Sequence, residues 1–364
     1  MKRPPCPATL PPGGTGPADS LAWRGIPTRP PPPGSGSERH TLLEPPRPSS
    51  PSTEQRVIEL LLERRAARPS WLHHDAGDDC AVIEGGEVVT VDTLVEGVHF
   101  GARLSAADVG FKAVAASVSD LASSGARPRW MLLALSLPPD PPVLPWVRAF
   151  ARGLAEACTQ FGVYLIGGDV TGVPAGGPRF VCPTLAGIAT SPMLRSTARP
   201  GDVVWVTGQL GLAGAGWSLD EPPPEALARL RRPQPPLSFA LALAASGLAT
   251  AAMDLSDGLA ADLPRLAWAS GVQAVIDPAR LPLSDALAGC PDPLALQLSG
   301  GEDYELLFTS PPGAEPELAQ LALEHGVQAT PIGALRPGRG AILIHEGGEP
   351  LPWPEPAFDH FGRA

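Results

Sequence analysis

The sequence predicts an α/β (α+β) fold with two domains. Helix-like and strand-like segments alternate from about residue 54 onward, as expected when helices cover the faces of β-sheets. Runs rich in Pro and Gly interrupt the alternation, and one near residues 190–200 suggests a domain boundary. The length beyond the N-terminal region, about 310 residues, is enough for two hydrophobic cores. We therefore predict an extension over 1–53 and domains over 54–190 and 191–364.

Proline sets the extension apart. The 364-residue chain has 47 prolines, and 15 of them lie in residues 1–51. Such a segment cannot bury enough apolar surface to offset the entropy lost on ordering, so we expect it to be disordered. It also lacks the continuous apolar stretch of a secretory signal.

The first predicted domain alternates Ala-rich amphipathic segments with β-branched runs. The apolar spacing predicts helices over 54–62, 106–124 and 144–161. Residues 84–87 predict a hairpin turn, and residues 167–169 are expected to end a short buried strand. The predicted strands cover residues 80–83, 88–95, 132–137, 163–166 and 180–189.

The second predicted domain has the same alternation. Pro-rich stretches over 221–224 and 233–236 are expected to be loops. The predicted strands cover 202–206, 272–276 and 306–308, and the predicted helices lie near 212–219, 237–247 and 258–269.

Composition excludes several classes of protein. The net charge of −11 argues against nucleic acid as a partner. The sequence contains no run of 18 apolar residues, so no membrane span is predicted. The five cysteines are scattered without a C-x-x-C pair, which indicates neither a zinc site nor a disulfide framework. We therefore expect a reduced, cytoplasmic compartment.

Lysine is nearly absent from the chain. Only Lys2 and Lys112 occur among the 27 basic residues, and no P-loop motif is present. A protein of this composition that handles nucleotide phosphates must neutralise them in another way. The role of Lys112, structural or close to phosphate, stays open at this stage.

Aspartates recur where strand-like runs meet turns. Carboxylates at strand ends suit Mg²⁺, which prefers oxygen ligands and bridges substrate phosphates. A single Asp beside Gly or Ser is more commonly a turn or helix cap, and spacing alone does not show that the positions converge. The aspartates concerned are Asp78, Asp79, Asp92, Asp120, Asp169, Asp254 and Asp257.

Six motifs containing these aspartates occur in a recognisable order. They are GDDCAV at 77–82, TVDTLVEGVHF at 90–100, SDLA at 119–122, GGD at 167–169, DLSDGL at 254–259 and GGEDYEL at 300–306. Together with FDHF at 358–361, they closely resemble thiamine-monophosphate kinases of the aminoimidazole-ribotide-synthetase-like superfamily. The resemblance covers about residues 54–361.

The resemblance implies transfer of the γ-phosphoryl group of ATP to thiamine monophosphate, with several Mg²⁺ ions. It implies that Asp120, Asp254 and Asp257 are catalytic. Val91 stands where relatives often have Thr, so its carbonyl would be the ligand. The implied metal ligands are Asp79, Thr90, Val91, Asp92, Asp120, Asp169, Asp254 and Asp257. The implied ATP contacts are Gly168, Asp169, Arg195 and Ser256, and the implied substrate contacts are His99, Glu302 and Phe358.

The resemblance also implies a homodimer in which the N-terminal domains form a β-barrel and the active site lies between the two domains of a chain. Taken alone, His99 would be read as a turn histidine and Phe358 as an anchor for the tail. The chain lacks the Cys-Lys pairing of selenophosphate synthetases and the C-terminal cysteine of hydrogenase-maturation relatives. A metal-dependent phosphohydrolase and a calcium-binding module remain alternatives from other classes.

Overall fold

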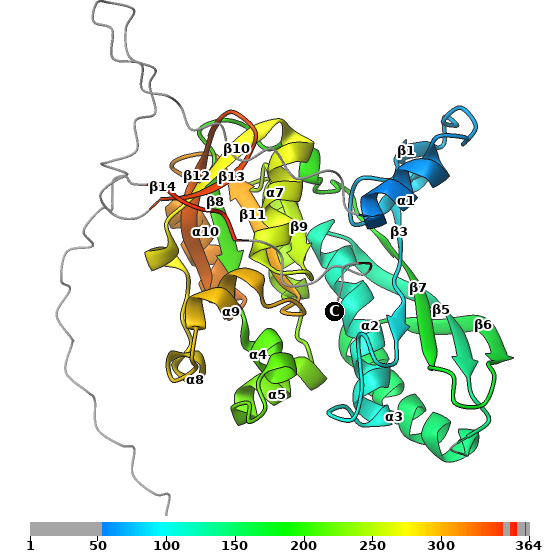
Figure 1. Ribbon diagram of the computed structural model, residues 1–364. Helices are drawn as coiled ribbons and strands as arrows, with labels where there is room; N and C mark the ends of the chain where they lie inside the picture. Colours follow the sequence, from blue (N-terminus) through cyan, green and yellow to red (C-terminus); the bar gives the residue numbers. More distant parts are fainter. Residues whose placement is uncertain (1–52, 141, 345–349, 355–360, 362–364) are drawn as a thin grey trace, which may run out of the picture. The chain divides into compact units, whose positions relative to one another are not determined.

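The computed structural model describes residues 53–140, 142–344, 350–354 and 361. These residues belong to one compact unit, Leu42–Ala364. The predicted extension lies outside the described residues except for Thr53, and so does Phe358. None of the described helices is long and apolar enough to cross a membrane. The described residues form two α/β domains, each with its own sheet and hydrophobic core, which confirms the predicted fold class (Figure 1).

The sheet of the first domain has the strand order β1-β2-β3-β7-β5-β6, and β4 pairs with β7. β5 and β6 are parallel, whereas the other pairs are antiparallel. A short 3₁₀ turn at Glu84–Gly86 joins β2 to β3 and confirms the predicted hairpin. The strands are β1 (Leu72–His74), β2 (Ala81–Ile83), β3 (Glu87–Val91), β4 (Leu94–Val95), β5 (Arg127–Leu137), β6 (Tyr164–Gly172) and β7 (Phe180–Ile188).

Three helices accompany this sheet: α1 (Thr53–Leu62), α2 (Ala106–Ser123) and α3 (Val143–Phe161), close to the predicted bounds. α2 begins at a capping box, in which the Ser105 side chain accepts from the Asp108 N–H and the Asp108 carboxylate accepts from the Ser105 N–H. α2 contacts α3, β3 and β7 in the first domain and β9 (Ala251–Leu255) and β11 (Glu305–Ser310) in the second. It is therefore the helix that links the two cores.

The predicted strand over 88–95 is divided in the structure. β3 ends at Val91, and pairing resumes only at Leu94 in β4. At the interruption, the Asp92 N–H still donates to the Pro183 carbonyl oxygen of β7 at 3.2 Å. Its side chain accepts a hydrogen bond of 2.6 Å from Ser117 Oγ in α2. The break thus turns a carboxylate toward the helix that lies between the domains.

The prediction for residues 163–169 was wrong. β6 continues through the Gly-Gly-Asp sequence to Gly172, and all nine of its residues are exposed rather than buried. The reason is its place at the edge of the sheet, next to β5 alone. Its apolar residues include Tyr164, Ile166 and Val170, whose exposed fractions are 74%, 56% and 70%.

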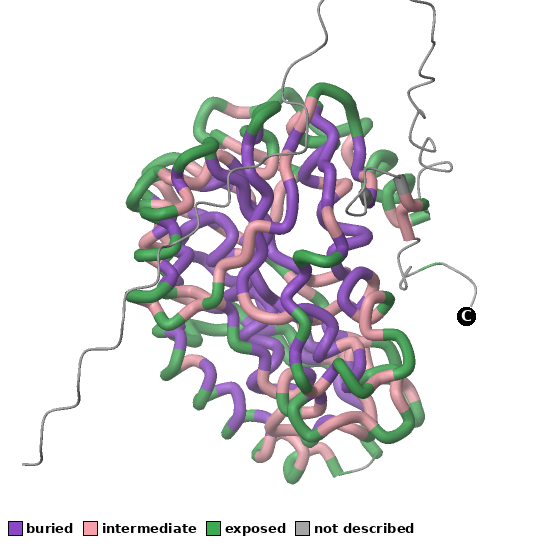
Figure 2. The backbone as a smooth tube through the Cα atoms, turned by 90° about the vertical axis from the view of Figure 1, so that its left-hand side faces the viewer, coloured by how far each residue is buried: buried purple, intermediate pink, exposed green. Residues whose placement is uncertain are grey.

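The second sheet has the order β14-β13-β10-β12-β8-β11-β9. Only β10 and β13 pair in parallel; the remaining described pairs are antiparallel. Every residue of β8, β9, β10 and β11 is buried, so this sheet forms the centre of the second domain (Figure 2). Its strands are β8 (Val203–Thr207), β9 (Ala251–Leu255), β10 (Val272–Ile276), β11 (Glu305–Ser310), β12 (Ala329–Pro337), β13 (Gly340–Ile344) and β14 (Pro350–Leu351).

The helices of the second domain include three that match the predictions, α4, α6 and α7. α7 packs against β9, β10 and β13, and α10 contacts β12. The sequence pattern did not predict α5, α8, α9, α10, β9 or β12–β14. The helices are α4 (Leu212–Ser218), α5 (Pro224–Arg231), α6 (Leu237–Ser246), α7 (Leu259–Ser270), α8 (Asp285–Ala288), α9 (Pro293–Ser299) and α10 (Glu315–Glu324).

Candidate active site

Three aspartates from distant parts of the chain meet between the two domains. Asp79 lies just before β2, Asp120 in α2, and Asp254 in β9. One carboxylate oxygen of each lies within 4.8 Å of the others. Like charges this close repel one another, whereas a bound cation would stabilise them.

Burial makes this repulsion strong. Burial raises the pKa of Asp120 well above its ordinary value, and the charges of Asp92, Asp254 and Asp79 raise this pKa further. Burial and the charge of Asp79 likewise raise the pKa of Asp254. Asp254 Oδ2 is buried without a hydrogen-bond partner. A buried carboxylate that lies close to two others and has one oxygen without a hydrogen-bond partner has the surroundings of a cation ligand.

Hydroxyl groups orient the carboxylates around this cluster. In α2, Ser117, Asp120 and Ser123 follow at intervals of three and lie on one helix face. This spacing was a readable signal for the two serines, which the sequence analysis missed. The bonds run from Ser117 Oγ to Asp92 Oδ2 (2.6 Å), from Ser123 Oγ to Asp79 Oδ2 (2.5 Å) and from Thr90 Oγ1 to Asp120 Oδ2 (2.5 Å).

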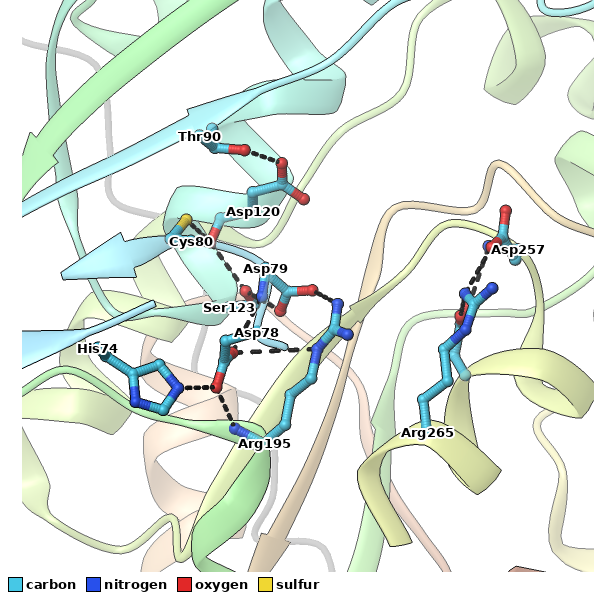
Figure 3. A network of polar contacts seen from close by, with 11 residues as sticks. His74, Asp78, Asp79, Cys80, Thr90, Asp120, Ser123, Arg195, Asp257 and Arg265 are labelled. Atoms are coloured by element: carbon cyan, nitrogen blue, oxygen red, sulfur yellow. Dashed lines mark hydrogen bonds and ion pairs between the residues drawn. The ribbon is translucent and has the colours of Figure 1, made fainter. Parts of the chain in front are cut away.

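Arg195 provides positive charge beside the cluster. Its guanidinium Nη2 donates to Asp79 Oδ1, and its backbone N–H donates to Asp78 Oδ2 at 3.0 Å (Figure 3). The charges of Asp79, Asp254 and Asp78 raise its pKa, although burial opposes them. The Nε atom is buried without a hydrogen-bond partner, although it lies 3.9 Å from Asp78 Oδ1 in an ion pair. A buried guanidinium whose Nε–H makes no hydrogen bond can donate to a further anion, such as a phosphate oxygen.

Asp257 stands apart from the three-carboxylate cluster (Figure 3). Its carboxylate accepts a 2.5 Å bond from Arg265 Nη1, which also donates to Asp262 at 2.8 Å. Asp262 Oδ2 in turn accepts from the Asp257 backbone N–H at 3.0 Å. The loop that carries Asp257 is thereby held against the start of α7.

A cavity of about 860 Å³ opens beside these groups. Its wall contains four carboxylates, Asp92, Asp120, Asp254 and Asp257, and Val91 and Ser256 also line it. The lining also includes apolar side chains that the sequence pattern did not indicate. These apolar side chains are Val98, Trp217, Leu219, Ala295 and Leu296.

The structure brings two of the predicted substrate residues, His99 and Glu302, into this cavity. His99 Nδ1 accepts from the Val95 N–H at 3.0 Å, which fixes the ring. Lys112 Nζ donates to Glu302 Oε1 at 2.6 Å and to the His99 carbonyl oxygen at 3.0 Å. The lysine left unassigned by the sequence is therefore the common partner of both.

Gly168 and Asp169 are not brought to the cluster. They lie in β6, which two strands separate from β3, and strands lie about 4.8 Å apart within a sheet. Gly168 has a packing role: a Cβ there would lie 1.9 Å from the Leu133 carbonyl oxygen of β5. Neither residue lines the cavity.

Comparison with known proteins identifies the family. The family descriptions "AIR synthase related protein, N-terminal domain" and "AIR synthase related protein, C-terminal domain" match residues 77–189 and 199–346. Thiamine-monophosphate kinase from Escherichia coli K12 is 38% identical over 306 residues, covering 78% of this chain and 91% of the relative. The chain belongs to the thiamine-monophosphate kinase family.

Solved structures agree with this membership of the thiamine-monophosphate kinases. AaThiL complexed with AMPPCP and TMP superposes with a TM-score of 0.67 at 30% identity, covering 82% of this chain and 94% of that one. Thiamine-monophosphate kinase from Stenotrophomonas maltophilia K279a superposes with a TM-score of 0.64 at 36% identity, covering 79% and 94%. The match includes both domains and hence both sides of the cavity.

Proposed function

We infer that this protein transfers the γ-phosphoryl group of ATP to thiamine monophosphate, forming thiamine diphosphate and ADP. The observation that carries this inference is the convergence of Asp79, Asp120 and Asp254 beside a cavity, in a chain of the thiamine-monophosphate kinase family. A polyphosphate at the acidic end would lie next to an apolar wall suited to an organic acceptor.

We propose that the cluster holds Mg²⁺. The donors fit this ion: they are carboxylate oxygens, and the Asp254 Oδ2 atom is buried without a partner. Bound Mg²⁺ would neutralise the phosphates and draw donor and acceptor together. Thr90, Val91, Asp92 and Asp257 are proposed as further ligands of several ions. Asp169 stays a proposed ligand too, although it lies on β6, separated from β3 by two strands and outside the cavity wall.

The protein groups around the cluster have separate proposed roles. Arg195 can donate its Nε–H, which makes no hydrogen bond within the described residues, to an ATP phosphate. Ser256 lies in the cavity wall and is proposed as a second ATP contact. Gly168 and Asp169 remain proposed ATP contacts, although the structure places both on the exposed edge strand.

We propose that thiamine monophosphate occupies the end of the cavity near His99 and Glu302. The apolar side chains that line the cavity, among them Trp217 and Leu296, suit the flat rings of thiamine, and an aromatic face attracts a thiazolium cation. Phe358 remains a proposed contact outside the described residues.

The proposed reaction needs little proton transfer. The acceptor phosphate is largely ionised near neutral pH because its second pKa is about 6. The barrier is therefore the approach of two anions in line, and catalysis consists of positioning and charge neutralisation. Asp120, Asp254 and Asp257 are proposed as catalytic through that neutralisation, without a phosphorylated enzyme intermediate.

We also propose a homodimer formed through the first sheet. All nine residues of β6 are exposed, as are Leu132 in β5 (40%) and Val91 in β3 (61%). An apolar edge strand of this length is prone to pair with another chain unless it is covered. A second copy of the chain that completes a barrel would cover it.

The proposed compartment is the cytoplasm, where ATP is available. The four described cysteines, Cys80, Cys158, Cys182 and Cys290, are free thiols, in keeping with a reducing environment. The net charge of −11 does not favour nucleic acid as a partner.

The function is tested by incubating the protein with ATP, Mg²⁺ and thiamine monophosphate and separating the products. We expect thiamine diphosphate and ADP in equal amounts. Release of phosphate from thiamine monophosphate without ATP would instead show a phosphohydrolase. Asp120→Asn is the site control and should lose activity, most severely at low Mg²⁺.

A further inference from the structure

Lys112 is an unusual residue in this chain. It is the only lysine apart from Lys2, and its side chain in α2 is fully buried. A buried ammonium group is costly unless it is paired and hydrogen-bonded. Its placement therefore needs a reason, particularly in a chain that uses arginine for nearly every other cation.

The two bonds of Lys112 supply that reason. Nζ donates to Glu302 Oε1 at 2.6 Å and to the His99 carbonyl oxygen at 3.0 Å. His99 comes from the first domain and Glu302 from the second, and both line the cavity. One ammonium group thus fixes two walls of the same cavity to each other.

Glu302 needs such an anchor. Its backbone has a φ of 68°, a left-handed conformation that L-residues other than Asn and Asp seldom adopt. Its N–H donates to the Ser256 carbonyl oxygen at 2.7 Å, so the backbone is held at the loop that also carries Asp257. The side chain remains 21% exposed at the cavity and is held by Lys112.

Lys112 does not itself touch the cavity, because it has no exposed surface and is absent from the lining. We propose that Lys112 is a positioning residue, which orients the Glu302 carboxylate and the His99 segment for thiamine monophosphate. This assignment rests on the proposed function. It predicts that loss of Lys112 weakens the binding of thiamine monophosphate but not the binding of ATP. The carboxylates that would bind metal and ATP are held by other groups, Ser117, Ser123 and Thr90.

The first test compares Lys112→Met with Arg232→Met. Arg232 is a matched control, because it also anchors α2, through a 3.0 Å bond to Asp108, but does not line the cavity. Lys112→Met should raise KM for thiamine monophosphate about ten- to hundredfold, the range for loss of a charged hydrogen bond, with KM for ATP changed less than about twofold. Arg232→Met should change neither constant.

The second test is a double-mutant cycle with Glu302→Gln. If Lys112 acts through Glu302, the double variant binds thiamine monophosphate about as weakly as Glu302→Gln alone. Additive losses would overturn the assignment. Equal rises in both KM values for Lys112→Met, or an unchanged KM for thiamine monophosphate, would also overturn it and show a purely structural ion pair.

The third test needs no substitution and so decides the matter even if Lys112→Met does not fold. Labelling lysine with ¹⁵N at Nζ gives two side-chain signals, since the chain contains only Lys2 and Lys112. Thiamine monophosphate should shift the Lys112 signal, and a non-hydrolysable ATP analogue alone should not. If the protein makes thiamine diphosphate but the Lys112 signal does not shift, the assignment of Lys112 is overturned while the proposed function stands. A wild-type protein that makes no thiamine diphosphate would overturn the proposed function and, with it, this assignment.

Discussion

Asp254→Asn should abolish the stabilisation that Mg²⁺ gives to this protein. Asp254 is 3% exposed, and its Oδ2 has no partner among the described residues. Asparagine keeps the shape of the side chain but removes the charge. In the absence of metal, the variant should unfold at the same temperature as the wild type or higher, because one of three mutually repelling carboxylates is gone.

The size of the effect follows from mass action. A ligand at one hundred times its dissociation constant stabilises the folded state by about 2.7 kcal/mol. For a folded part of about 310 residues, with an unfolding entropy of roughly 2.1 cal/mol/K per residue, this corresponds to a Tm increase of about 4 °C. The wild type should show that increase with Mg²⁺, and Asp254→Asn should show less than about 1 °C at the same concentration.

The assay is thermal unfolding with and without Mg²⁺, and Asp303→Asn is its control. Asp303 is another buried aspartate of the second domain, but it accepts from the Gly211 and Ala213 N–H groups and lies outside the cluster. That variant should keep the full Mg²⁺ effect. A full Mg²⁺ effect in Asp254→Asn, or none in the wild type, would refute the metal site.

Three further predictions concern pH, packing and assembly. Burial raises the pKa of Asp303 to about 7, so the folded state binds the Asp303 proton more tightly than the unfolded state does. The protonated carboxyl therefore contributes to stability at low pH, and this contribution falls by about 2 kcal/mol between pH 5 and 7. Urea unfolding at both pH values should show a smaller fall for Asp303→Asn, and an unchanged fall would count against this. Gly168→Ala should destabilise the protein by about 1–3 kcal/mol, because the new Cβ meets a carbonyl oxygen of β5. The control Gly167→Ala places a Cβ only against a side-chain carbon at 3.4 Å, so it should lower the free energy of unfolding by less in the same urea titration. Equal losses in the two variants would disprove the clash. If the protein forms the proposed dimer, Ile166→Asp in β6 should make it a monomer in light scattering, whereas Leu323→Asp on α10 should not. A dimer that survives Ile166→Asp would exclude this interface.

The sequence predicted much of the fold because many elements carry their own local signal. α2 and α3 have long apolar periodicity, and the helix and strand bounds near them agree closely with the structure. The prediction for β6 failed because its local signal was misleading. Its apolar residues read as a buried strand, but burial depends on neighbours, and this strand has a partner on one side only.

For the candidate site, too, some features could be predicted from the sequence and others could not. The order of the aspartate motifs was enough to indicate the family, yet spacing along the chain could not show that Asp79, Asp120 and Asp254 meet. Lys112 could not be assigned, because its partner Glu302 lies 190 residues away. Contacts of that kind appear only when the two domains are seen together.

The most direct measurement of the central claim follows the γ-phosphoryl group itself. Wild-type protein in excess is mixed with γ-labelled ATP, Mg²⁺ and thiamine monophosphate, and the reaction is stopped within a single turnover. The account predicts that the label passes directly into thiamine diphosphate at the rate at which ADP forms. Label in inorganic phosphate, or on the protein before thiamine diphosphate appears, would contradict it.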